Sequence, residues 1–277
     1  MSLGKAKAKS VLDSLEIDDP SLLVNLNEIC MARGVFVREG HIDGAEARLT
    51  IGDSFSRVKA VILARPNDTY ETRTRFSIAH ELGHFELHKN IQATISCSER
   101  ELNEWFGKQA HQEREIEANE FASELLLPER FIRPVIHAQS NPSLNLVDSL
   151  ASKYQTSFIA TARRLIDLTE EACALVFFKK DRILYHVPSE LFRRQHYWIA
   201  LGPLDMASMA YDAATKGKNG AYMSAVDAAT WVDISEMKDW QRSKIEDAKI
   251  LEQARFFPKL DLGISLLWIK DPKLIWN

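Results

Sequence analysis

Cysteine is scarce in this chain, and its distribution argues against two kinds of stabilising site. The three cysteines, Cys30, Cys97 and Cys173, are far apart and odd in number, and no two of them form a C-x-x-C pair. They therefore indicate neither a disulfide framework nor a zinc site built from thiolates. Buried free thiols in a reducing compartment are the simpler interpretation.

Recognisable targeting and membrane segments are also lacking. Residues 1–7 carry positive charge, but no apolar stretch follows them, so the pattern is not that of a secretory signal peptide. The longest apolar runs, such as residues 60–64, are far too short to cross a bilayer. We therefore expect a cytoplasmic protein that does not associate with membranes.

The chain has no large excess of charge of either sign. Its formal net charge is −4, so the molecule as a whole has no general attraction to nucleic acid or to an anionic membrane. At 277 residues it exceeds the usual length of one domain. We expect one large domain or two modest ones with a sizeable core.

Secondary-structure patterns predict an α+β protein in three parts. In the first part, residues 1–140, helical periodicity surrounds a few short β-type runs, which predicts helices packed on a small, mostly antiparallel sheet. Residues 141–170 read as a pair of short helices joined by a turn at 154–157. β-type runs return in residues 171–277, which we expect to form a C-terminal α+β domain.

An H-E-x-x-H motif lies in the helix expected over residues 72–88. Residues four apart on a helix lie one above the other, so His80 and His84 can converge on one metal ion. Glu81 is rotated by about 100° from His80, which suits a base acting on water beside the metal. The alternative is a solvated polar stripe, but the rest of this helix is apolar, so the histidines need a buried role.

Two histidines do not complete a catalytic zinc site, which normally has three protein ligands. The extended motif with a third histidine fails, because Leu87 and Asn90 occupy the positions of its glycine and its last histidine. His88 lies on the same helical face as His80 but about 12 Å along the axis, too far to bind the same ion. It either lines the site or is a local histidine satisfied by its neighbours.

The helix expected over residues 113–127 offers a carboxylate as the third ligand. A helical wheel places four of its five glutamates on one side, as a solvated face would be: Glu113, Glu117, Glu120 and Glu124. Glu115 alone lies within the apolar arc, where a carboxylate is costly unless it is paired or bound to metal. Asn119, one turn below, either orients a ligand or pins the helix.

These two helices resemble those of the ImmA/IrrE family of metallopeptidases. Residues 75–88 read RFSIAHELGHFELH, similar to the metal helix of the family, and residues 115–128 read EIEANEFASELLLP, similar to its second helix. The resemblance implies a zincin-like core within residues 1–140, with His80, His84 and Glu115 as ligands of Zn²⁺, or less readily of Mn²⁺ or Fe²⁺. It covers about residues 60–130 and leaves the C-terminal domain unmatched; in some relatives a second domain with a sensor-like fold occupies this place.

The resemblance also implies an activity and a partner. Several members of this family cleave helix-turn-helix repressors and so release stress or mobile-element genes, which implies a zinc endopeptidase with a repressor as its protein substrate. Glu81 would act as the general base. Tyr70, Arg73, His88 and His111 are unranked candidates for an oxyanion donor. The run over residues 58–63 could be an exposed sheet edge on which substrate adds as a strand.

Two other functions compete with this interpretation. Residues 150–165 have the rhythm of a DNA-binding helix-turn-helix, but Gln155 stands where a turn glycine is common. The presumed reading helix has only Arg163 and Arg164 as strong cations, so we do not expect direct DNA binding. The second rival is a ligand-sensing regulator that holds metal without turnover. An intact Glu81 argues against it, because metal binding alone needs no base there.

Overall fold

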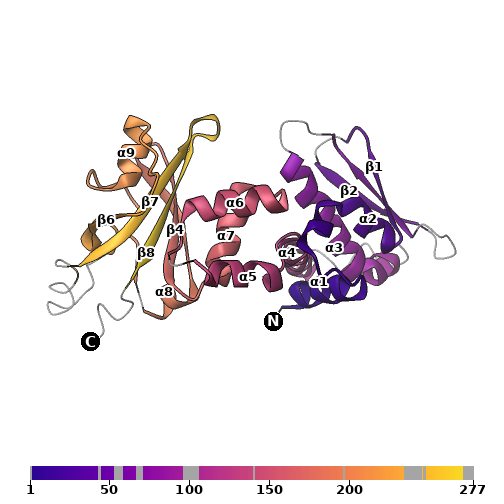
Figure 1. The fold of residues 1–277 in the computed structure, drawn as a ribbon. Coiled ribbons are helices and arrows are strands. Elements are labelled where there is room, and N and C mark those ends of the chain that lie inside the picture. The colour runs from indigo at the N-terminus through magenta and orange to yellow at the C-terminus, as the bar shows by residue number, and fades with distance from the viewer. Residues whose placement is uncertain are drawn as a thin grey trace. The chain divides into compact units, whose positions relative to one another are not determined.

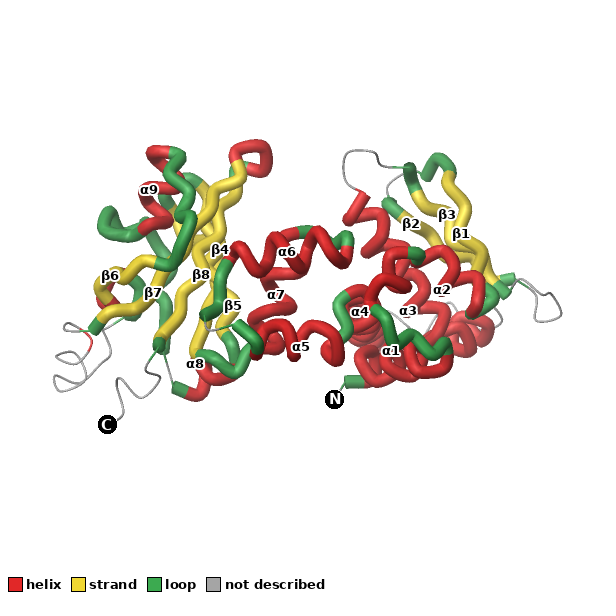
Figure 2. Tube along the Cα trace, viewed as in Figure 1, coloured by secondary structure: helices red, strands yellow, loops and turns green. Residues whose placement is uncertain are grey.

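The computed structural model describes residues 2–42, 45–52, 59–66, 71–95, 106–139, 141–195, 197–233, 245 and 248–270, without the side chains of residues 90–95 and 106–111. It is a mixed α+β structure, which confirms the expected fold class (Figures 1 and 2). The chain divides into two compact units: Met1–Phe131 with Leu150–Ala160, and Ile132–Ser149 with Thr161–Asn277. The three-part division into residues 1–140, 141–170 and 171–277 remains a prediction. Cys97 lies outside the described residues.

The first unit contains the two helices that carry the motif residues. Its helical segments are α1 (Leu3–Ser14), the 3-10 helix η1 (Pro20–Val24), α2 (Leu26–Ala32), α3 (Glu71–Ile95), α4 (Phe106–Leu126) and the start of α5 (Glu129–His137). Helix α4 packs against both α1 and α3. Gly83 permits a close approach of α3 to α4, because a Cβ there would lie 3.2 Å from the Ala118 Cα and 3.1 Å from the Phe121 ring.

The small sheet of the first unit contains β1 (Val35–Glu39), β2 (Ala47–Ile51) and β3 (Ala60–Ala64) in the order β1-β3-β2. β2 pairs with β3 antiparallel, whereas β1 pairs with β3 parallel, so the sheet is mixed rather than mostly antiparallel. β3 is the central strand and pairs on both sides. The prediction that residues 58–63 form an exposed edge is therefore wrong for the described part of that run.

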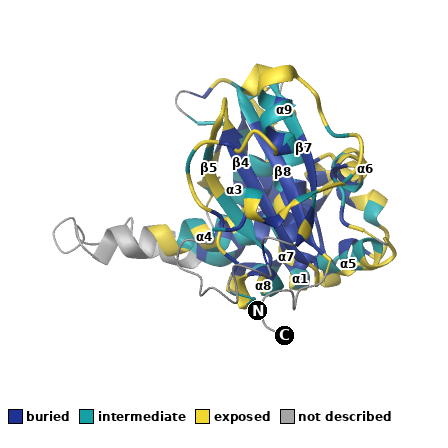
Figure 3. Cartoon of the chain, turned by 90° about the vertical axis from the view of Figure 1, so that its left-hand side faces the viewer, coloured by how far each residue is buried: buried dark blue, intermediate teal, exposed yellow. Residues whose placement is uncertain are grey.

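The second unit is built on a five-stranded antiparallel sheet. Its strands are β4 (Ala172–Lys179), β5 (Arg182–Pro188), β6 (Ser224–Asp227), β7 (Lys249–Phe257) and β8 (Leu262–Ile269), in the order β5-β4-β8-β7-β6. Its shorter helices are α8 (Glu190–Arg194), α9 (Met209–Lys216), η2 (Ala228–Thr230) and η3 (Pro258–Leu260). β4 and β8 are buried along nearly their whole length (Figure 3), which requires cover on both faces of the sheet.

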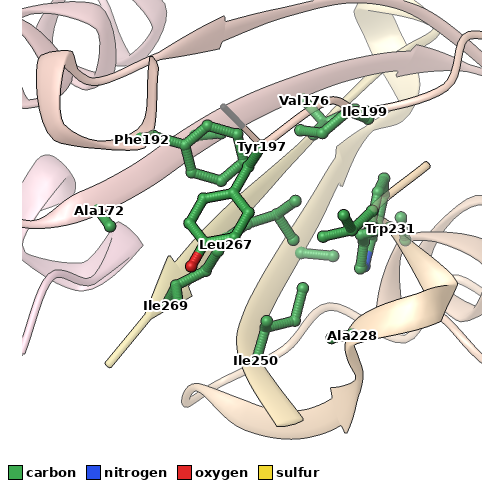
Figure 4. Packing of buried hydrophobic residues seen from close by; sticks show 14 of the residues in the cluster. Ala172, Val176, Phe192, Tyr197, Ile199, Ala228, Trp231, Ile250, Leu267 and Ile269 are labelled. Carbon is green, nitrogen blue, oxygen red and sulfur yellow. The ribbon is translucent and has the colours of Figure 1, made fainter. Parts of the chain in front are cut away.

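One face of this sheet packs into the main apolar cluster of the second unit. Alternate residues of β4, including Ala172 and Val176, meet Phe192, Tyr197 and Trp231 from the segments that cover this face (Figure 4). On the opposite face of β4, Phe177 packs against the neighbouring aromatic ring on β5. Side chains alternate between faces along a strand, so β4 serves both layers.

The predicted helical pair is present as α6 (Leu144–Tyr154) and α7 (Phe158–Leu168). Gln155, in the turn between them, has a φ of 50°, the left-handed conformation that favours glycine. None of the described helices combines the length and apolar character needed to cross a membrane.

Candidate metal centre

Helix α3 presents two imidazoles to one point. Its buried side carries Ile78, Ala79 and Leu82 into the core, which fixes the rotation of the helix. His80 and His84, one turn apart, then lie together, with their Nε2 atoms 3.0 Å apart. The predicted convergence of these two side chains is what the structure shows.

Helix α4 brings a carboxylate to the same point. The two carboxylate oxygens of Glu115 lie 3.2 Å from the Nε2 atoms of His80 and His84, one oxygen to each ring. One ligand atom from each of the three residues falls within 4.8 Å of the others, and this is the one such group found among the described residues. The close contact at Gly83 allows this, because it lets the α4 backbone approach the histidine-bearing face of α3.

Polar side chains hold the far sides of both rings. The Nδ1 of His80 lies 3.0 Å from the Asn119 side-chain oxygen. The Nδ1 of His84 lies 3.1 Å from the Nδ1 of His88, and the Nε2 of His88 lies 2.9 Å from a carboxylate oxygen of Glu117. His88 therefore contacts His84 and Glu117, and Asn119 contacts His80; that either residue belongs to the site remains a prediction.

Glu81 lies half-buried beside this group. Burial raises the pKa of its carboxyl to about 7; a hydrogen bond from the backbone amide of Leu49 on β2 opposes the rise, and the charge of Glu115 adds to it. The contact with Leu49 places β2 next to the catalytic candidate. A carboxyl whose pKa is near neutrality can both accept and return a proton.

The wheel of α4 misjudged two glutamates. Glu117 and Glu124 were expected on a solvated face, but Glu117 bonds to His88, and Glu124 is 1% exposed and accepts a hydrogen bond from the Glu129 amide at the start of α5. Both bond to residues outside α4, which a wheel of that helix alone does not include. The pairing of His88 with Glu117 could have been sought from their positions facing each other on the two motif helices.

The candidates for an oxyanion donor remain unranked. Tyr70 and the side chain of His111 lie outside the described residues. Arg73 is largely exposed and lies 3.5 Å from Glu46. His88 is 2% exposed and is bonded to His84 and Glu117, so it does not face the point where the ligand atoms converge.

Comparison with known families identifies the domain that contains the two motif helices. Residues 35–166 match the family model described as the IrrE N-terminal-like domain, Peptidase M78. The chain carries an IrrE N-terminal-like domain. The resemblance of the two motif helices to the ImmA/IrrE metallopeptidases is thereby confirmed, and both helices lie within the matched segment of the IrrE-like domain.

Solved structures extend the likeness to the whole fold. A Mycobacterium tuberculosis transcriptional regulator aligns with a TM-score of 0.57 at 16% identity, over 96% of this chain and 76% of that chain. At that identity the match shows a shared fold. No curated protein sequence matches the chain significantly.

Proposed function

We propose that the protein is a zinc-dependent endopeptidase whose metal is held by His80, His84 and Glu115, with Glu81 as its general base. One observation carries the metal assignment. If Asn119 accepts the Nδ1 proton of His80 and His88 accepts that of His84, both Nε2 atoms carry lone pairs. These lone pairs face each other and the Glu115 carboxylate at 3.0–3.2 Å, an arrangement that a cation between them would stabilise.

The donor set favours zinc over the alternatives. Two imidazoles and one carboxylate are a common ligand set for catalytic zinc, and three protein ligands leave a position open for water or substrate. Mn²⁺ prefers more oxygen donors, and the same two-histidine, one-carboxylate set also suits Fe²⁺. We therefore rank Zn²⁺ first.

Glu81 performs the proton transfers in the proposed reaction. Bound zinc would supply a Lewis acid that polarises the peptide carbonyl and lowers the pKa of water. Glu81, held by the Leu49 amide, takes a proton from the attacking water and returns it to the nitrogen of the departing amine. The C–N bond breaks, and the products are a carboxylate and an amine.

Substrate is proposed to bind along β2 rather than along β3. β2 ends the sheet, and Glu46 and Gly52 at its two ends make backbone hydrogen bonds with residues that flank β3. Hydrogen-bonded positions alternate in antiparallel strands, so the backbone groups of Ala47, Leu49 and Ile51 point away from β3. An extended peptide added there would lie beside Glu81.

The substrate we propose is a helix-turn-helix transcriptional repressor in a stress-response or mobile-element pathway in the cytoplasm. The support is membership of the ImmA/IrrE family. Direct DNA binding by the protein itself has less support, because Arg164 is 1% exposed and Arg163 donates a hydrogen bond to the Tyr185 hydroxyl while lying over its ring. Neither of these two cations of α7 is placed to bind phosphate.

The test compares wild type with Glu81→Gln in cells that carry the genes neighbouring this one. The substitution keeps the three ligands and removes the base, so we expect a new N-terminus in one repressor-like protein with wild type alone, detected by mass spectrometry of protein N-termini. With the purified substrate, the cleavage rate should fall by about 10²–10⁴-fold. Identical profiles from two metal-loaded proteins would contradict the peptidase and favour the sensor that holds metal without turnover.

A further inference from the structure

A chain of hydrogen bonds continues from His84 away from the point where the ligand atoms converge. It passes from the Nδ1 of His84 to the Nδ1 of His88 over 3.1 Å, and from the Nε2 of His88 to Glu117 over 2.9 Å. We propose that His88 and Glu117 are positioning residues, an inference that rests on the proposed zinc site. Together they fix the proton of His84 on Nδ1 and so direct the Nε2 lone pair at the metal.

The direction of the chain follows from counting protons. An ionised carboxylate only accepts hydrogen bonds, so Glu117 requires the Nε2 of His88 to be the donor. A neutral His88 then has a lone pair on Nδ1, which accepts the Nδ1 proton of His84. The Nε2 of His84 is left without a proton, as a metal ligand must be. Reversing any one bond would point an N–H from His84 toward His80 and Glu115.

Burial of His88 protects this chain of hydrogen bonds from exchange with water. His88 is 2% exposed, so water does not readily replace either of its partners, while the Glu117 side chain is 30% exposed and reaches the surface of the unit. An acceptor bonded to the far nitrogen of a metal-binding histidine raises its basicity and fixes its ring. Here the effect of the Glu117 carboxylate is transmitted through a second imidazole.

Helix α4 therefore supplies both a ligand and the anchors of the other two ligands. Glu115 faces the proposed ion, Asn119 accepts from the Nδ1 of His80, and Glu117 anchors His84 through His88. His80 is thus backed by one neutral amide, whereas His84 is backed by a chain that ends in a charge. Loss of Glu117 should weaken metal binding without removing any ligand.

The test measures Zn²⁺ affinity by competition with a fluorescent chelator, and Co²⁺ binding by its visible absorption bands. Glu117→Gln should weaken Zn²⁺ binding about 10-fold and alter the Co²⁺ bands, because the amide can turn and donate to His88 instead. The matched control is Glu113→Gln, an exposed glutamate on the same helix, which should bind within about twofold of wild type.

A double-mutant cycle separates positioning from simple structural support. His88→Ala should also weaken binding, and adding Glu117→Gln to it should change the affinity by less than about twofold, because the chain is already broken. If His88→Ala fails to fold, Glu117→Gln still carries the test, since its side chain is partly exposed and keeps its shape. Wild-type affinity in Glu117→Gln would overturn this inference alone. Absence of metal binding in wild type would overturn the zinc site itself.

Discussion

Two glutamates, one in each unit, show how differently a fold can use a carboxylate. Glu252 on β7 is 0% exposed and accepts four hydrogen bonds: from the amides of Met209 and Ala210 at the start of α9, from the Trp231 indole and from the Ser265 hydroxyl. Glu115 on α4, whose side chain is 39% exposed, instead faces the Nε2 atoms of His80 and His84.

The comparison teaches that the neighbours of a carboxylate indicate its role better than its exposure does. Four donors around Glu252 offset the cost of taking it out of water, and they tie α9, β8 and Trp231 to β7. In the proposed tautomers of His80 and His84, the lone pairs that converge beside Glu115 leave a place for a cation. The first arrangement is complete without a ligand, and the second would gain stability from the proposed metal.

The largest expected effect comes from removing the four-donor carboxylate. Glu252→Ala should lower the free energy of unfolding of the second unit by about 3–5 kcal/mol, because it leaves several buried donors without an acceptor. Urea unfolding followed by tryptophan fluorescence reports mainly on this unit, since five of the six tryptophans follow residue 161. Glu190→Ala, an exposed control on α8, should change stability by less than about 0.5 kcal/mol.

A Glu252→Ala protein as stable as the control would remove the contrast between the two carboxylates. It would mean that the Met209 and Ala210 amides find water or a new acceptor at little cost. Circular dichroism should accompany fluorescence, because Trp231 itself contacts the substituted side chain.

The next effect in size concerns the metal. Zn²⁺ at about 100 times its dissociation constant should stabilise wild type by about 2.7 kcal/mol. Glu115→Gln should lose most of that gain, while its metal-free form should be at least as stable as metal-free wild type, because an amide N–H can donate to an imidazole lone pair. Differential scanning calorimetry with and without a chelator measures both. A metal-free Glu115→Gln protein as unstable as Glu252→Ala would show that Glu115 is a structural acceptor too.

Part of this contrast can be predicted from sequence. The spacing of His80 and His84 on one helix predicts their convergence, because it follows from the geometry of a single helix. The wheel of α4 selects Glu115 for an apolar arc, but its side chain is 39% exposed in the structure. The wheel fails for Glu117 and Glu124, whose partners lie on α3 and at the start of α5.

The central position of β3 and the hydrogen-bond partners of Glu252 could not be predicted from the sequence for a related reason. A parallel pairing of β1 with β3 places β3 in the centre, and no local pattern in the short runs encodes that register. The donors to Glu252 come from Met209, Trp231 and Ser265, which lie 43, 21 and 13 residues from it along the chain. Long-range packing decides both features.

The smallest expected effect is a pH dependence that sharpens the account of Glu252. Burial raises the pKa of its carboxyl above the ordinary value of 4.5, and hydrogen bonds from Trp231, Met209, Ser265 and Ala210 oppose the rise. Between the ordinary and the raised pKa the folded state binds more protons than the unfolded state, so stability falls as pH rises through this window.

The Gln side chain in Glu252→Gln does not titrate. The unfolding free energy of wild type minus that of this variant should therefore decrease as pH rises from about 4.5. Urea unfolding of the two proteins at a series of pH values measures it, and the comparison cancels the titration of all other groups that the substitution leaves unchanged. If this difference instead increased with pH, the shift of the Glu252 pKa on folding would have the opposite sign. The four donors would then outweigh burial, and the pKa of the Glu252 carboxyl would be lowered by folding.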